Sequence, residues 1–113
     1  MRPLVARSKV WLEVDGQPFL GDGRYRLLLA VDRSGSINAA ARELGLSYRK
    51  VWTQLQAMEA SAPFPLLERR TGGKGGGATQ LTPAAIELLE HYSRLRLQAR
   101  QETDRCFEEI FPS

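Results

Sequence analysis

The middle of the chain, from Ser47 to Gln56, contains many hydrogen-bonding side chains and no carboxylate. A helix beginning at Ser47 that buries Val51, Leu55 and Met58 turns its polar residues to the opposite face. These polar residues are Tyr48, Arg49, Lys50, Thr53, Gln54 and Gln56. Arginine can hold a guanine edge and glutamine an adenine edge through two hydrogen bonds in the DNA major groove. The first residues of such a helix are those that usually reach bases.

We therefore expect this helix to contact DNA, with its cap residue serving a phosphate rather than a base. The predicted contacts are Ser47, Tyr48, Arg49, Lys50, Thr53 and Gln54. Trp52 has two interpretations: packing against a neighbouring element, which is favoured, or contact with a thymine methyl group or a sugar.

A glycine-rich segment with three positive charges follows, within LLERRTGGKGGGATQLT. Two short strands flanking such a tip make a wing, and glycine lets the backbone come close to phosphates. The predicted phosphate contacts are Arg69, Arg70, Thr71, Gly73 and Lys74. A nucleotide-binding P-loop is excluded, because it needs Ser or Thr after the lysine and then a helix, whereas Gly75 follows Lys74. A flexible linker remains an alternative.

Residue types that catalyse reactions are scarce. His91 and Cys106 are the only histidine and cysteine, and they lie fifteen residues apart on one predicted helix. About four helical turns separate them, too far for a nucleophile and its base to meet. No metal-ligand spacing is present. We expect neither enzymatic activity nor a cofactor in this chain.

The elements that position the polar helix form a helix-turn-helix. Ser36 is a suitable cap for a short helix in which Ile37, Ala40, Ala41 and Leu44 share one apolar face. Gly45 ends this helix, Leu46 is expected to fill an apolar site in the turn, and Ser47 caps the next helix, which ends before Pro63. A short glycine-containing turn between two helices is typical of DNA-binding proteins. Ser36 is also a candidate DNA contact, and an ordinary helical hairpin is the alternative.

Three further elements surround this unit. Alternating residues from Val10 to Val14, then Asp15-Gly16, predict a β-hairpin. Asp22 is expected to cap a helix with Tyr25, Leu28 and Leu29 on one face, which runs to about Ser34 and ends at Gly35. Thr82-Pro83 begins a last helix that runs to near Phe111, about 42 Å at 1.5 Å per residue.

The last helix is too long to be explained by packing on so small a head. Apolar residues recur on it at a spacing of seven, which is typical of a coiled-coil face. The predicted dimer interface consists of Ala85, Leu88, Tyr92, Leu95 and Ala99. A twofold dimer places two recognition helices about one DNA turn, ~34 Å, or a multiple apart, and so predicts an inverted-repeat operator.

Composition agrees with a single small domain. The 113 residues carry a net charge of +3, with 12 basic and 7 acidic residues in positions 1–80 and 4 basic and 6 acidic residues after them. The basic part therefore coincides with the predicted DNA-facing head. The sequence has no secretory signal and no apolar run long enough to cross a membrane, and its lone cysteine cannot form an internal disulfide. We therefore expect a cytoplasmic protein.

The segments SGSINAAARELGLSYRKVW and LLERRTGGKGGGATQLT, with the helix that follows, resemble the DNA-binding domain of ModE-type molybdate-responsive regulators. The tract ERRTGGKGGG is the most specific part, and a looser resemblance to LysR-type regulators rests on residues 47–58 and on LLER and LTPAA. The resemblance covers about residues 9–99. It implies a dimeric winged helix that regulates genes of molybdate transport or of cofactors.

Regulators of the ModE type also carry C-terminal oxyanion-binding domains, whereas this sequence ends at Ser113. We therefore expect any molybdate sensing to reside in a separate protein or at a site that the sequence does not reveal.

The predicted fold is mainly α with a small β component: a winged helix-turn-helix with an N-terminal hairpin and a long C-terminal dimerisation helix. The DNA-binding head spans 1–82, with the helix-turn-helix at 36–60 and the wing at 66–82, and the dimerisation helix spans 83–113. The predicted function is sequence-specific binding of double-stranded DNA by a homodimer. A protein–protein adaptor, or a dimerisation partner of a longer regulator, is the alternative.

Overall fold

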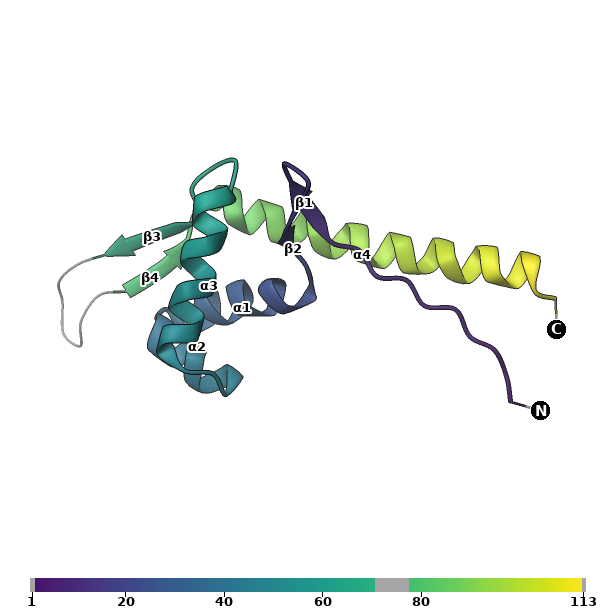
Figure 1. Ribbon diagram of the computed structural model, residues 1–113, viewed down its shortest axis with the longest axis horizontal. Helices are drawn as coiled ribbons and strands as arrows, with labels where there is room; N and C mark the ends of the chain where they lie inside the picture. Colours follow the sequence, from purple (N-terminus) through teal and green to yellow (C-terminus); the bar gives the residue numbers. More distant parts are fainter. Residues whose placement is uncertain (1, 71–77, 113) are drawn as a thin grey trace.

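A computed structural model describes residues 2–70 and 78–112. It consists of a helical head from which one long helix and the extended N-terminal segment leave in the same direction (Figure 1). The radius of gyration is 17.6 Å and the extents are 60 × 30 × 21 Å. A compact chain of about 100 residues has a radius of gyration of about 13 Å, so the protruding helix dominates the shape.

The N-terminal hairpin pairs β1 (Leu12–Val14) with β2 (Gln17–Leu20) in antiparallel register. Asp15 and Gly16 both have positive φ, 52° and 75°, which is the conformation of the hairpin turn that Asp-Gly favours. The predicted hairpin is confirmed. Its second strand buries Phe19 and Leu20 against the head.

Three helices form the centre of the head: α1 (Asp22–Ser34), α2 (Ile37–Leu44) and α3 (Tyr48–Ser61). Gly35 and Gly45 end α1 and α2 with φ of 79° and 69°, the left-handed conformation that favours glycine at helix ends. The Ser36 hydroxyl accepts a hydrogen bond from the backbone N–H of Ala39. These predicted helix boundaries are confirmed.

The predicted cap at Asp22 is wrong. Gly21 occupies the N-cap position, with no side-chain cap hydrogen bond. Asp22 is the first helical residue, and its carboxylate instead accepts hydrogen bonds from Tyr92 and Arg96. The Asp22 side chain therefore hydrogen-bonds to Tyr92, seventy residues further along the chain, instead of capping α1 as local rules predict.

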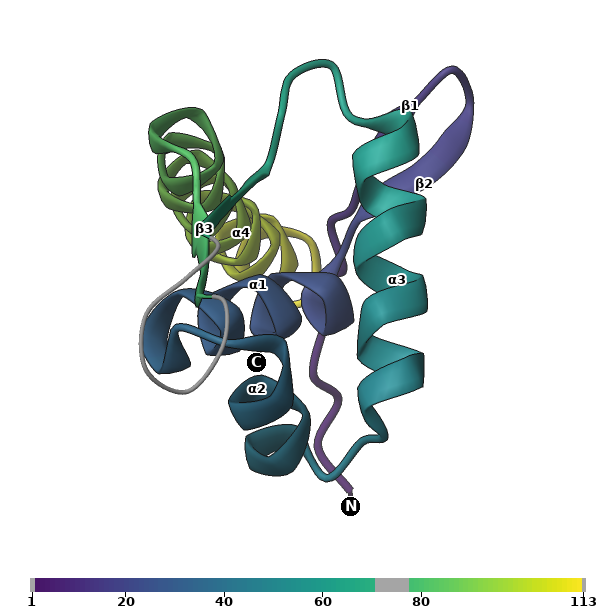
Figure 2. The same cartoon turned by 90° about the vertical axis from the view of Figure 1, so that its left-hand side faces the viewer.

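The wing consists of β3 (Leu67–Arg70) and β4 (Ala78–Leu81), paired antiparallel with Leu67 opposite Leu81 and Arg70 opposite Ala78. The backbone N–H of Thr79 donates to the carbonyl of Gly35 at 2.9 Å, which attaches the wing to the α1–α2 junction. Figure 2 shows the wing strands on one side of α1 and α2, and α3 on the other.

The last helix, α4 (Pro83–Ile110), begins where the sequence predicts. The Thr82 hydroxyl accepts from the backbone N–H of Ala85 at 3.1 Å and donates to the carbonyl of Pro65 at 2.7 Å. This cap joins α4 to both ends of the wing. In the described residues no helix is long and apolar enough to cross a membrane.

One core holds the head together, built from every helix and from strands β2 and β4. Its buried side chains are Phe19, Leu20, Leu27, Leu28, Ala30, Val31, Ile37, Ala40, Ala41, Val51, Leu55, Met58, Leu66, Leu81, Ala85, Leu89 and Tyr92. The buried faces predicted for α2 and α3 are confirmed, apart from Leu44, which is half-buried. For α1 the prediction missed Leu27 and Ala30, which are buried, while Tyr25 and Leu29 are half-buried.

Two of the predicted interface residues on α4 belong to this core. Ala85 and Tyr92 are 0% and 1% exposed within the chain itself, and Leu88 packs against the core as a half-buried residue. A second copy of the chain cannot reach Ala85 or Tyr92 in this conformation, so their assignment to a dimer interface is wrong. Beyond Tyr92 no residue of α4 is buried, and the C-terminal part of the helix projects from the head (Figure 1).

Candidate nucleic-acid interface

The helix-turn-helix has the short, stiff connection that the sequence predicts. Gly45 reverses the chain, and its backbone N–H donates to the carbonyl of Arg42, while the N–H of Leu46 donates to Ala41. Ser47 caps α3 through its hydroxyl, which accepts from the N–H of Lys50 at 3.1 Å. Because every junction is hydrogen-bonded, α2 fixes the direction in which α3 projects.

Leu46 does not fill an apolar site, as the sequence suggested. It is 38% exposed, and Tyr48 and Trp52 are 48% and 41% exposed. The packing that was favoured for Trp52 therefore leaves much of its ring in solvent. Exposed apolar groups beside a polar helix face are suited to contact thymine methyl groups.

The first half of α3 presents the predicted polar residues together. A shallow hollow of about 350 Å³ on this helix is lined by Ser47, Arg49, Lys50, Thr53 and Gln54. Of these, all but the half-buried Gln54 are exposed, as is Tyr48. Glu59 is the first carboxylate of the helix, and it lies at the far end, where it accepts a hydrogen bond from the backbone N–H of Leu66. The hollow thus carries positive charge without a neighbouring acid on α3.

Gln54 is held by a residue that sequence reasoning did not identify. Arg24 of α1 donates from Nε to Oε1 of Gln54 at 3.2 Å and from its guanidinium to the carbonyl of Phe19 at 3.0 Å. This contact occupies the amide oxygen and leaves the amide NH₂ group of Gln54 as its donor. No local signal in the sequence connects two residues thirty positions apart.

Only two of the phosphate contacts predicted for the wing, Arg69 and Arg70, lie within the described residues. Arg69 is exposed on β3 beside Arg70, opposite Thr79 and Ala78. Thr71, Gly73 and Lys74 lie outside the described residues. Ser36, the remaining predicted contact, is half-buried at the start of α2. The wing and the helix-turn-helix occupy the end of the molecule opposite to the C-terminus (Figure 1).

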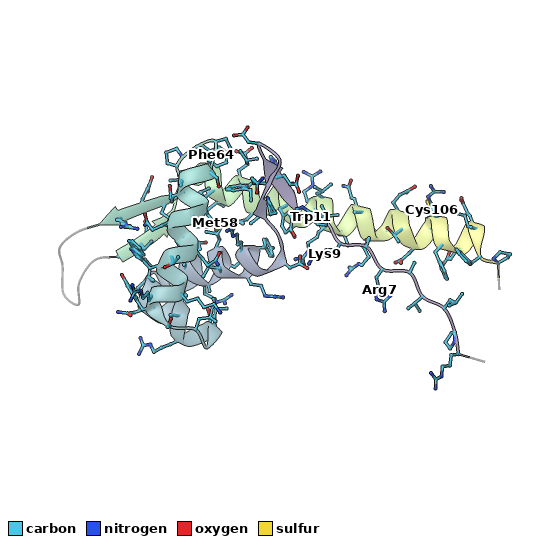
Figure 3. All side chains as sticks on the ribbon, viewed as in Figure 1. Arg7, Lys9, Trp11, Met58, Phe64 and Cys106 are labelled. Atoms are coloured by element: carbon cyan, nitrogen blue, oxygen red, sulfur yellow. The ribbon has the colours of Figure 1, made fainter. Side chains whose placement is uncertain are left out.

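Side-chain chemistry away from this surface is limited. His91 is exposed and lies 3.7 Å from the carboxylate of Glu87 on the same helix. Cys106 lies near the end of α4, well away from the head, as Figure 3 shows. In the ranges that the structure describes, no three His, Cys, Asp or Glu side chains gather in a way that could hold a metal ion.

Known proteins are similar to this chain in sequence and in fold. The sequence profile of the family described as "Bacterial regulatory helix-turn-helix protein, lysR family" matches residues 23–86. The chain is 38% identical over 103 residues to the molybdenum transport protein ModE of Azotobacter vinelandii, covering 91% of this chain and 38% of the relative. It is 48% identical over 77 residues to the transcriptional regulator ModE of Haemophilus influenzae, covering 68% and 30%. The chain thus spans 38% and 30% of the length of these two relatives.

Among solved structures, the chain is similar to the DNA-binding domain of CbnR in a crystal structure of its complex with DNA. The TM-score is 0.55 at 30% sequence identity, over 78% of this chain and 95% of that domain. This likeness confirms the winged helix-turn-helix fold.

Proposed function

Because the chain belongs to the lysR family of bacterial regulatory helix-turn-helix proteins, we propose that it is a transcriptional regulator that binds double-stranded DNA sequence-specifically. The observation that carries this proposal is the exposed first half of α3, which presents two cations and several hydrogen-bonding groups without a carboxylate. Arg49 is suited to hold a guanine edge, and Gln54 to donate to a base acceptor through its amide NH₂ group. The DNA backbone is held by Ser36, Ser47 and the wing, including Lys74.

The regulated genes are, in this proposal, related to molybdenum. Support comes from the two ModE proteins, one named for molybdenum transport and the other as a transcriptional regulator. They are identical to this chain at 38% of 103 and 48% of 77 aligned residues. The regulator acts in the cytoplasm and requires no cofactor to bind DNA.

The regulator acts as a homodimer joined through the part of α4 beyond the head. Leu95 and Ile110 are 44% and 69% exposed, and a helix of 3.6 residues per turn places them on the same side. Ala99 is half-buried between them in sequence. Apolar side chains on a projecting helix are stabilised when a second helix covers them. Such a dimer binds an inverted repeat with half-sites about one DNA turn, ~34 Å, or a multiple apart.

Salt dependence of DNA affinity tests the proposal most directly. Binding to random duplex DNA is measured by fluorescence anisotropy at several NaCl concentrations for the unmodified chain, Arg49→Ala and the control Arg94→Ala. Each phosphate that the protein neutralises adds about 0.9 to the slope of log affinity against log salt. We expect a slope of several units for the unmodified chain and for Arg94→Ala, because Arg94 lies on α4. A slope near zero refutes DNA binding.

Selection of bound sequences from a random pool then tests specificity. We expect an inverted repeat for the unmodified chain and a relaxed preference at one base pair per half-site for Arg49→Ala. The selection is repeated with and without molybdate, and we expect the same sequences in both, because base reading is assigned to α3 alone. An unselective pool contradicts base reading by α3.

A further inference from the structure

A second basic surface lies outside the DNA-binding end, in a groove between the extended N-terminal segment and α4. The groove has a volume of about 370 Å³ and is lined by Ser8, Lys9 and Val10 on one side and by Ser93, Arg96, Leu97 and Arg100 on the other, with Asp22 at its end. Figure 3 shows Lys9 on this segment, to the side of the head from which α4 projects. The groove therefore brings together three cations and two hydroxyl groups from distant parts of the sequence.

The single carboxylate of the groove is already partnered. Asp22 Oδ1 lies 2.9 Å from a guanidinium nitrogen of Arg96 and 3.0 Å from the Tyr92 hydroxyl. The guanidinium of Arg96 also lies over the rings of Tyr25 and Tyr92, at 5.0 and 5.7 Å from their centroids. These contacts fix Arg96 at the wall of the groove. Three cations against one carboxylate leave a local charge of +2.

The remaining donors of the groove have no partner. In residues 2–70 and 78–112, neither Lys9 nor Arg100 forms an ion pair. Over the same ranges, the hydroxyls of Ser8 and Ser93 form no hydrogen bond, although other serine hydroxyls do. An ammonium group, a guanidinium group and two hydroxyls that face one hollow are the donors that bind oxyanions in proteins.

We propose that this groove binds a free tetrahedral oxyanion of charge −2, such as molybdate or sulfate. The local charge of +2 matches the charge of the ion, and Lys9, Arg100, Ser8 and Ser93 line the groove as donors for its oxygens. A volume of 370 Å³ holds such an ion together with several waters, each of about 30 Å³. A DNA phosphate is the less suitable ligand, because the groove lies between the N-terminal segment and α4 and shares no residue with the hollow on α3.

Nuclear magnetic resonance tests the proposal on the full chain. Sodium molybdate and sodium sulfate are titrated separately at constant ionic strength, with sodium chloride as the reference salt, while backbone amide shifts are followed. We expect saturable shifts at Ser8, Lys9 and the residues around Arg100 with one ion per chain. Lys9→Gln and Arg100→Gln should each weaken binding about tenfold, since a hydrogen bond from a charged donor is lost.

Arg94→Gln is the matched control, because it removes the same charge from α4 at a position that lines a different hollow. Affinity for the oxyanion should stay unchanged in this variant, and thermal unfolding followed by circular dichroism should show that all three variants fold. Absence of saturable shifts, or an equal loss of affinity in Arg94→Gln, overturns the proposal. Shifts of the groove residues that appear with duplex DNA and not with the free ions overturn it in favour of a DNA phosphate site.

Discussion

Replacing Tyr92 by phenylalanine tests how α4 is attached to the head. The Tyr92 side chain is 1% exposed, and its hydroxyl lies 2.9 Å from the carbonyl of Val10 and 3.0 Å from Asp22 Oδ1. A hydroxyl has one proton, so the variant loses one hydrogen bond to an acceptor and leaves two acceptors without that donor. Hydrogen bonds to charged groups contribute about 1.5–3 kcal/mol.

We expect Tyr92→Phe to lower the free energy of unfolding by about 1.5–2 kcal/mol, the lower part of that range. Water and Arg96 replace part of the lost contact, because the side chains of Asp22 and Arg96 are 43% and 42% exposed. For a domain of this size the melting temperature should fall by roughly 4 °C per kcal/mol. Urea unfolding at one fixed protein concentration measures the change, since association would otherwise shift the result.

The loss of stability should also depend on pH. The hydrogen bond from Tyr92 is the largest cause that holds the pKa of Asp22 below its ordinary value of 3.8, followed among the lowering causes by the charge of Arg96. A depressed carboxyl pKa stabilises the fold above the unfolded pKa, and this stabilisation is lost as the pH falls through the folded pKa. The difference between the unmodified chain and Tyr92→Phe should therefore be larger at pH 7 than below pH 3.

Tyr25→Phe is the control, because Tyr25 packs at 5.3 Å from the Tyr92 ring and its hydroxyl forms no hydrogen bond in the described part of the chain. It should change the free energy of unfolding by less than about 0.5 kcal/mol. Equal losses in the two variants, or a loss in Tyr92→Phe that is the same at pH 7 and pH 2, refute the role given to the Tyr92–Asp22 contact.

Four further variants test the head, the wing and α4. Arg69→Ala should weaken binding to all DNA sequences alike and reduce the salt slope by about one; a changed base preference in the selected sequences would contradict a phosphate contact. Arg24→Ala should relax selection at the same base pair as Gln54→Ala, and an effect at a different base pair would separate the two residues. Leu95→Glu should leave the circular dichroism spectrum of the folded chain unchanged but shift sedimentation toward the monomer, whereas an unaltered dimer would place the interface elsewhere. Gly45→Ala should cost about 1–2 kcal/mol in urea unfolding, because alanine is strained at φ 69°; a cost as small as that of Gly23→Ala, in a helix with open space around it, would contradict this cause.

The sequence determines the helix boundaries well because their causes are local. Ser36, Ser47 and Thr82 each accept from the backbone N–H three residues later, and a cap of this kind is visible in a window of four residues. Gly35 and Gly45 are similarly readable, since each allows the left-handed turn that ends a helix.

The errors arise where a distant partner decides the outcome. Asp22 follows a capping rule in sequence, yet it pairs with Tyr92 and Arg96 of α4. A spacing of seven on α4 describes an apolar face, but not whether the chain's own head or a second copy covers it. The buried positions of Ala85 and Tyr92 show that the head covers the first part. The hydrogen bond from Arg24 to Gln54 likewise depends on how α1 and α3 pack.

The continuous path of α4 makes the distance between two heads sensitive to a small rotation. Tyr92 and Arg96 contact Asp22 at the head, and the helix from Tyr92 to Ile110 extends about 27 Å at 1.5 Å per residue. If two copies are clamped together near their C-terminal ends, a tilt of about 10° at Asp22 moves each head by roughly 5 Å, since the displacement is the arm length times the sine of the angle. That displacement exceeds the ~3.4 Å rise of one base pair. The hydrogen bonds of Asp22 fix the angle between α4 and the head. In a dimer, this angle would determine the distance between the two heads and therefore the spacing of the half-sites that they fit.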